Sequence, residues 1–205
     1  MIRQFKLALG FATLALMVPP AMAAPTLFNT GVNNVGAQLA LGSVDSHWTV
    51  VETGTLAFVL NTQLVGTYVS SPTALYIWQQ ADGNPGSVTR TLRQTFDMTG
   101  FNPATAQITG RYSTDNSGII RLNGVTVGPA SNTFTAFTGF TLNTNFVAGV
   151  NTLDFVTTDA GAPAALMVDQ LVLTATATSS NGPEPGTLAL LSLGAVLALA
   201  RRRKP

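Results

Sequence analysis

The sequence contains no cysteine, and its 205 residues include a single histidine, His47. Without cysteine the chain has no disulfide framework, so its fold must be held by an apolar core. A Ser-His-Asp or Cys-His catalytic system would depend on His47 alone, and no G-x-S-x-G motif accompanies it. We therefore interpret His47, which stands beside Trp48, as a partly exposed strand residue, and we expect a protein that is not an enzyme.

Charged residues are also scarce, at 9% of the chain. Residues 24–182 contain no lysine, and their net charge is about −4 although the whole chain carries +1, because the termini hold the remaining cations. The charged residues of this acidic body are Arg90, Arg93, Arg111 and Arg121 against Asp45, Glu52, Asp82, Asp97, Asp115, Asp154, Asp159 and Asp169. An acidic body does not suit a phosphate backbone, so nucleic acid is not an expected partner.

Several aspartates stand in turn-like segments: Asp82 in "ADGNPG", Asp115 in "TDNSG" and Asp159 in "TDAG". Aspartate favours turns because its side chain bonds to nearby backbone, so these residues are expected to be structural. A surface hydrolase is the remaining enzymatic alternative, and it would need these carboxylates to converge in a cleft. Neither zinc-ligand spacing nor an EF-hand loop is present, so no cofactor is expected. A calcium ion held by loop aspartates stays open, with Asp45, Asp82 and Asp115 as donors.

The first 23 residues have the pattern of a secretory signal peptide. Arg3 and Lys6 form a positive n-region, and residues 7–18 form an apolar h-region that ends at two prolines. Ala21 and Ala23 provide a small-x-small cleavage site. The apolar run is shorter than the roughly 20 residues that a membrane span requires. We expect a signal-peptide helix, export through the Sec translocon, and removal of residues 1–23 by signal peptidase.

Residues 24–178 are rich in Thr, Val, Gly, Asn and Ala and poor in helix-favouring Lys and Glu. Short apolar–polar alternations recur between clusters of Gly, Asn, Asp and Pro, which is typical of strands separated by turns. The expected strands are 47–52, 56–60, 74–80, 91–98, 106–113, 119–124, 125–128, 134–142, 151–158 and 164–178. Asn123-Gly124 is a type I′ hairpin dipeptide. The pattern predicts an all-β domain, a two-sheet jelly-roll-type β-sandwich.

Three large aromatic residues are candidates for ligand binding, namely Trp48, Tyr76 and Trp78. Flat aromatic faces pack on sugar rings, and the strand period of two places Tyr76 and Trp78 on one face. Large aromatic side chains also dominate the packing of protein cores. We favour core packing, and a carbohydrate-binding module that uses these three rings is the alternative function.

A series of stretches in the body resembles a known class of domain. "DSHWTVVETG", "IWQQADG", "TFDMTGFNPATAQITGRYSTDNSGIIRLNGVTVG" and "FTAFTGFTLNTNFVAGVNTLDFVTTDAGAPAALMV" follow in this order. Together they are similar to an exported bacterial β-sandwich domain of the galactose-binding-like, jelly-roll type. The resemblance spans roughly residues 30–177. It implies the fold and an extracellular setting in which polysaccharide is a possible partner, but it assigns no ligand-contacting residue.

The C-terminal segment carries a second resemblance. Pro183-Glu184-Pro185 precedes an apolar run, residues 188–200, and four cations follow it: Arg201, Arg202, Arg203 and Lys204. These three parts resemble the PEP-CTERM sorting signal. The resemblance implies a Gram-negative bacterium, recognition and cleavage near the triplet by a membrane protease called an exosortase, and delivery to the cell surface or the biofilm matrix, often with exopolysaccharide.

The physical properties of the tail agree with this interpretation. Residues 187–200 would span about 21 Å as a helix, less than a hydrocarbon core of about 30 Å, which suits a transient anchor. The cations would keep the C-terminus cytoplasmic and act as stop-transfer charges, so the body would stay periplasmic. The expected organisation is a signal peptide (1–23), a β-sandwich (24–178), a linker with the triplet (179–186), and a transmembrane helix with a basic tail (187–205).

Overall fold

The computed structural model describes residues 25–178, which belong to one compact unit. The expected signal peptide, the Pro-Glu-Pro triplet and the expected transmembrane helix lie outside these residues. Within residues 25–178, no helix is long and apolar enough to cross a membrane. The structure therefore bears on the body of the protein.

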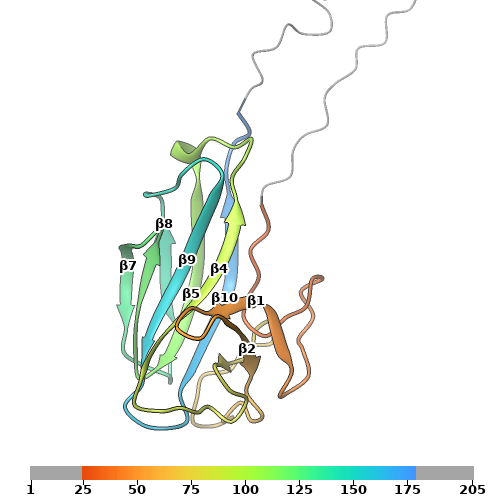
Figure 1. Cartoon of the computed structure of the whole chain (residues 1–205), viewed down its shortest axis with the longest axis vertical. Helices are drawn as coiled ribbons and strands as arrows, with labels where there is room; N and C mark the ends of the chain where they lie inside the picture. Colours follow the sequence, from red (N-terminus) through yellow and green to blue (C-terminus); the bar gives the residue numbers. More distant parts are fainter. Residues whose placement is uncertain (1–24, 179–205) are drawn as a thin grey trace, which may run out of the picture. The chain divides into compact units, whose positions relative to one another are not determined.

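Ten strands and one short 3₁₀ helix make up the described part of the chain (Figure 1). The strands are β1 (Val44–Val50), β2 (Thr55–Val59), β3 (Ile77–Trp78), β4 (Thr89–Asp97), β5 (Gln107–Asp115), β6 (Ser117–Leu122), β7 (Val125–Ser131), β8 (Thr138–Leu142), β9 (Val150–Thr158) and β10 (Ala165–Thr174). The helix, η1, covers Pro103–Thr105 and is capped by the Asn102 side chain, which accepts a hydrogen bond from the backbone N–H of Ala104.

The strands follow the order β7-β6-β9-β4-β1-β2-β3-β10-β5-β8, and neighbouring strands pair antiparallel. This order folds over on itself into two layers. Tyr112 of β5 and Phe155 of β9 belong to distant strands in the order, yet their ring centroids are 5.2 Å apart. Phe140 of β8 lies 5.8 Å from the same Phe155 ring. The predicted all-β sandwich is confirmed, with β1, β2 and β3 connecting the two layers.

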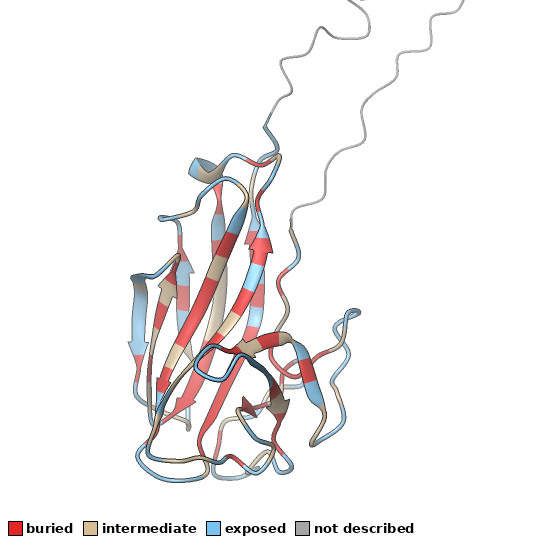
Figure 2. Cartoon of the chain, in the orientation of Figure 1, coloured by how far each residue is buried: buried red, intermediate tan, exposed pale blue. Residues whose placement is uncertain are grey.

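Side chains alternate between the core and the surface along the longer strands, as Figure 2 shows. On β4, Leu92, Gln94 and Phe96 are buried, whereas Thr95 and Asp97 are exposed. The core includes several side chains with no exposed surface, and the largest are Trp48, Trp78, Tyr76 and Tyr112. Burial of apolar surface contributes about 25 cal/mol per Å², so these rings supply a large share of the stability.

The strand predictions hold best where a hairpin fixes the register. Asn123 and Gly124 connect β6 to β7 with φ angles of 52° and 81°, as a type I′ turn requires. The prediction for 74–80 is wrong in extent, because the Tyr76 N–H donates to the side chain of Gln63 and only Ile77–Trp78 pairs as a strand. The predicted strand 134–142 begins only at Thr138.

Two arginine–aspartate pairs stand on directly paired strand positions. Arg93 of β4 faces Asp154 of β9, with Nε–Oδ1 and Nη2–Oδ2 distances of 2.7 and 2.8 Å. Arg111 of β5 faces Asp169 of β10, and its Nε and Nη2 atoms lie 2.9 and 2.6 Å from Oδ2. These pairs use two of the four arginines of the body, one pair in each layer.

Candidate functional site

The three aromatic candidates for sugar binding lie in the core. Trp48, Tyr76 and Trp78 each have 0% exposed surface. Tyr76 bonds to the Ser113 hydroxyl over 2.9 Å, and the Trp78 Nε1–H donates to the carbonyl of Pro85 over 3.1 Å. Burial raises the pKa of Tyr76 to about 12. The alternative in which these rings form a sugar-stacking platform is therefore wrong, because a ligand cannot reach them.

The single histidine, His47, sits in β1 and is only partly exposed, as expected. Its ring stacks on Phe28 with centroids 3.8 Å apart, and Nε2 lies 2.8 Å from the Asn34 Oδ1 atom. Nδ1 lies 3.4 Å from Oδ1 of Asp45, which is fully buried. No serine hydroxyl is bonded to the ring among the described residues, so no nucleophile is paired with this histidine.

The three calcium donors proposed from the sequence occupy different settings. Asp45 accepts hydrogen bonds from the backbone N–H groups of Gly31 and His47, at 2.6 and 3.0 Å. Burial raises the pKa of Asp45, and those two hydrogen bonds oppose the effect. Asp82 is exposed, and its hydrogen bonds to Asn84 lower its pKa. No group of three or more acidic or histidine residues that could hold a metal occurs within residues 25–178, so these aspartates do not form one site.

Asp115 instead lies at the end of the sandwich where four connections meet: residues 60–76, 79–88, 116 and 159–164 (lower end in Figure 1). We call this region the loop end. The residue after Asp115, Asn116, donates its backbone N–H to the carbonyl of Thr158 over 3.0 Å, which brings Asp115 beside the segment that contains Asp159. Tyr68 donates its hydroxyl proton to Oδ2 of Asp115 and lies 3.0 Å from the carbonyl oxygen of Pro163. Ser87 N–H donates to Oδ2 of Asp159 over 2.9 Å. Hydrogen bonds therefore tie both carboxylates into the contacts between loops.

The two carboxylates raise the pKa values around them. Burial raises the pKa of Asp115, the negative charge of Asp159 raises it further, and the hydrogen bond from Tyr68 opposes both effects. The pKa of Tyr68 is raised by burial and by Asp115 and Asp159. The loop end is thus a buried, negatively charged environment.

Close backbone approach holds the loops together. A Cβ atom on Gly83 would lie 2.6 Å from Cβ of Pro163, and one on Gly86 would lie 2.2 Å from the backbone N of Ala162. Only glycine permits such contacts. Ala160 N–H adds a 2.6 Å hydrogen bond to the Asn116 side chain. The loops around the two carboxylates are therefore fixed by packing as well as by hydrogen bonds.

The hydrolase alternative needed Asp82, Asp115 and Asp159 to converge in a cleft. The side chain of Asp82 bonds within its own exposed turn, whereas Asp115 and Asp159 are only 6% and 3% exposed. Sequence reasoning named both buried aspartates but did not pair them, and it missed Tyr68. No local pattern marks these contacts, because Tyr68 and Asp159 lie 47 and 44 positions from Asp115.

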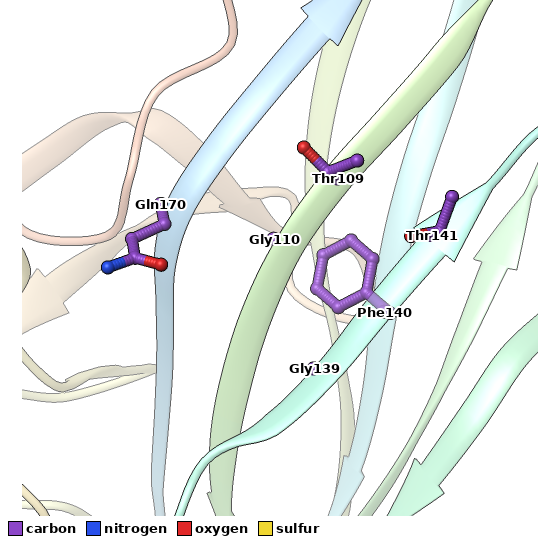
Figure 3. Close-up of a pocket in the computed structure, with 6 residues that line it drawn as sticks. All are labelled: Thr109, Gly110, Gly139, Phe140, Thr141 and Gln170. Atoms are coloured by element: carbon purple, nitrogen blue, oxygen red, sulfur yellow. The ribbon is translucent and has the colours of Figure 1, made fainter.

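Two shallow depressions lie elsewhere on the surface. Figure 3 shows the first, over β5, β8 and β10, lined by Thr109, Gly110, Gly139, Phe140, Thr141 and Gln170. The second lies beside β1 and β4, with Phe28, His47, Arg93 and Gln94 in its wall. Both are mainly polar, and neither contains one of the aromatic residues proposed as sugar contacts.

Residues 183–204 match the PEP-CTERM protein-sorting motif. The match includes the Pro-Glu-Pro triplet, the apolar run and the four cations, and it confirms the resemblance seen in the sequence. The chain therefore carries a PEP-CTERM sorting signal, which indicates an exported protein sorted by an exosortase. No curated protein matches the chain in sequence.

Solved structures with a similar arrangement of strands include carbohydrate-binding modules. CBM35 from Paenibacillus barcinonensis is 21% identical, with a TM-score of 0.37 over 65% of this chain and 96% of that one. A family 35 module from an environmental isolate is 12% identical, with a TM-score of 0.38 over 74% and 99%. Xyl-CBM35, in complex with a glucuronic acid containing disaccharide, is 14% identical, with a TM-score of 0.39 over 75% and 100%. Because the identities and TM-scores are this low, we do not assign the ligands or activities of these modules to this chain.

Proposed function

We propose that this protein is a non-enzymatic component of the cell surface or extracellular matrix, released from a transient inner-membrane anchor by an exosortase. The match of residues 183–204 to the sorting motif carries this proposal. Pro183, Glu184 and Pro185 form the recognition and cleavage region, and the apolar run is the temporary anchor. Arg201 to Lys204 hold the C-terminus on the cytoplasmic side.

The folded body extends almost to the motif. Thr178 donates its backbone N–H to the carbonyl of Gly100 over 2.8 Å, and Asn102 N–H donates to Thr176 over 2.8 Å. Only residues 179–182 separate Thr178, which is held by the hydrogen bond to Gly100, from Pro183. Five extended residue steps reach about 17 Å, so cleavage takes place close to the folded domain.

Mass spectrometry of the mature protein from cells with and without the exosortase tests the proposal. Cells with the protease should yield a surface or matrix product that ends near the triplet, and cells without it should retain residues 187–205. Replacing Pro183, Glu184 and Pro185 with alanine should block processing, whereas Ser179→Ala should leave it unchanged. Recovery of intact residues 187–205 in the surface product of wild-type cells would refute the cleavage.

The linker length gives a second test of the same proposal. Deleting residues 179–182 would bring the triplet directly against the fastened end of the domain, so cleavage should slow or stop. Inserting four Gly/Ser residues there should leave cleavage intact, because a longer flexible linker only increases reach. Equal processing of the deletion and insertion variants would show that the protease works independently of the domain.

Binding of extracellular polysaccharide is a second candidate, favoured by the polar depression of Figure 3. Thr141 and Gln170 are exposed there beside Thr109, and hydroxyl and amide groups can bond to sugar hydroxyls. A glycan array with the full chain tests this function. Binding should fall with Gln170→Ala and persist with Val172→Ala, and equal binding by both variants would exclude this surface.

A further inference from the structure

The loop end buries oxygen atoms that have no hydrogen-bond partner. Oδ1 of Asp115 and Oδ1 of Asp159 are both buried and unpartnered among the described residues, although each Oδ2 accepts a hydrogen bond. The hydroxyl of Thr157, which has 0% exposed surface, is also unpartnered there. Alternate positions of an extended segment share a face, so Thr157 and Asp159 project toward the same side. Buried polar atoms normally have partners, so these three atoms need an explanation.

No cation of the described part of the chain forms an ion pair with these oxygens. Asp115 and Asp159 form no salt bridge, whereas the ion pairs within residues 25–178 involve Asp45, Asp154 and Asp169. Of the nearby cations, Arg90 bonds to the side chain of Gln79 and to the carbonyl of Thr89. A buried carboxylate without a counter-ion is costly, so a proton or a cation bound at the unpartnered oxygens would stabilise the loop end.

We propose that the loop end binds one calcium ion between Asp115 and Asp159. Calcium takes about 6–8 oxygen ligands from carboxylates, carbonyls and water, and the oxygens available here are of these kinds. Asp115 Oδ1 and Asp159 Oδ1 supply the charge, and the Thr157 hydroxyl and the Pro163 carbonyl are the neighbouring neutral donors. The Pro163 carbonyl has two lone pairs, so it can bind a cation even where it shares the proton of the Tyr68 hydroxyl, which lies 3.0 Å away.

The donor chemistry distinguishes calcium from other divalent ions. Zinc prefers His and Cys, the chain has no cysteine, and its single histidine belongs to β1. Magnesium keeps several water molecules and demands strict octahedral geometry, which a mostly buried pair of carboxylates does not offer. Of the donors considered from the sequence, Asp115 belongs to this site, and Asp45 and Asp82 do not.

Thermal unfolding of the full chain in detergent tests the proposal, followed by tryptophan fluorescence. Trp48 and Trp78 are the only tryptophans of the chain, and both lie in the domain core, so the signal reports on this domain. Extracellular modules bind calcium with Kd values of about 10⁻⁴–10⁻³ M. Calcium at 10 mM should therefore raise the Tm by about 3–10 °C over EDTA, and 10 mM magnesium should have little effect.

Asp159→Asn and Asp115→Asn should abolish the calcium-dependent rise in Tm, whereas Asp82→Asn, a matched change in an exposed neighbouring turn, should retain it. Terbium luminescence sensitised by Tyr68 and displaced by calcium provides a readout on the unaltered chain if a variant fails to fold. Three results would overturn the proposal: no difference between calcium and EDTA, an unchanged calcium response in Asp159→Asn, or a rise in Tm with falling pH that is not matched by any rise in Tm with calcium, which would show that only a proton neutralises the pair.

Discussion

The carboxylate of Asp169 is buried in the layer formed by β5, β8 and β10, where it pairs with Arg111. Its Oδ2 atom accepts two N–H bonds from Arg111, at 2.9 and 2.6 Å. Its Oδ1 atom accepts the Thr73 hydroxyl over 2.7 Å and the Asn29 amide over 3.4 Å. Burial acts to raise the pKa of Asp169, but the hydrogen bonds from Thr73 and Arg111 outweigh it and hold the pKa below its usual value.

We expect Asp169→Asn to lower the free energy of unfolding by about 3 kcal/mol. Removing one partner of a buried ion pair costs about 3–5 kcal/mol. The lower end applies because the Arg111 side chain is 32% exposed and water can hydrate part of it. Asp154→Asn is the matched control. Within residues 25–178 the Asp154 side chain bonds only to Arg93, so this variant should lose about 2 kcal/mol of stability.

Urea denaturation at pH 7, followed by the fluorescence of Trp48 and Trp78, measures both losses. The denaturant midpoint should shift with little change in the m-value, because each variant exposes nearly the same surface area on unfolding as the wild-type protein. Arg111→Met combined with Asp169→Asn should cost less than the sum of the single changes. A loss below about 1 kcal/mol for Asp169→Asn, or one no larger than for Asp154→Asn, would contradict this account of the network.

Three further predictions concern the core and the loop end. Leu166→Ala should cost about 2–5 kcal/mol in urea denaturation because Leu166 is fully buried, whereas Val172→Ala at a 52% exposed position should cost under 1 kcal/mol. The pKa of Asp115 is raised, so its protonated form favours the folded state; without calcium, stability should fall as pH rises through that pKa, and Asp115→Asn should remove this slope. Tyr68→Phe should cost about 1–2 kcal/mol by thermal unfolding, since Asp115 and Pro163 lose a hydroxyl donor.

The sequence was sufficient for strands whose alternation and turns agree. The alternation of the last predicted strand, 164–178, places Leu171 and Leu173 on one face, and these two residues are 7% and 6% exposed. Where the backbone bonds to a distant loop and not to a neighbouring strand, the apolar–polar alternation misleads. Phe134 looks like the start of a strand, but its carbonyl accepts a hydrogen bond from Val69 N–H and its ring packs 4.7 Å from that of Tyr68. Such contacts depend on a loop more than sixty residues away.

The sorting signal was readable from the sequence because all its parts are contiguous, whereas the loop end was not. Asp115 and Asp159 each follow turn chemistry that a local interpretation explains fully. Their common burial arises only when β5 and β9 enter opposite layers of the sandwich. Two aspartates therefore indicate a binding site only once their hydrogen-bond partners and their burial are known, and neither can be derived from the sequence.

The loop end and Thr178, the last described residue, lie at opposite ends of β10 (Figure 1). The loop that contains Asp159 leads into Ala165 at one end, and the chain leaves the domain after Thr178 at the other. Ten strand residues at about 3.3 Å each separate the ends by about 33 Å. A ligand at the loop end would thus be far from Thr178, after which the linker begins, so we expect Asp159→Asn to be cleaved and released like the wild-type chain. Loss of processing in a folded Asp159→Asn variant would show that the two ends are coupled.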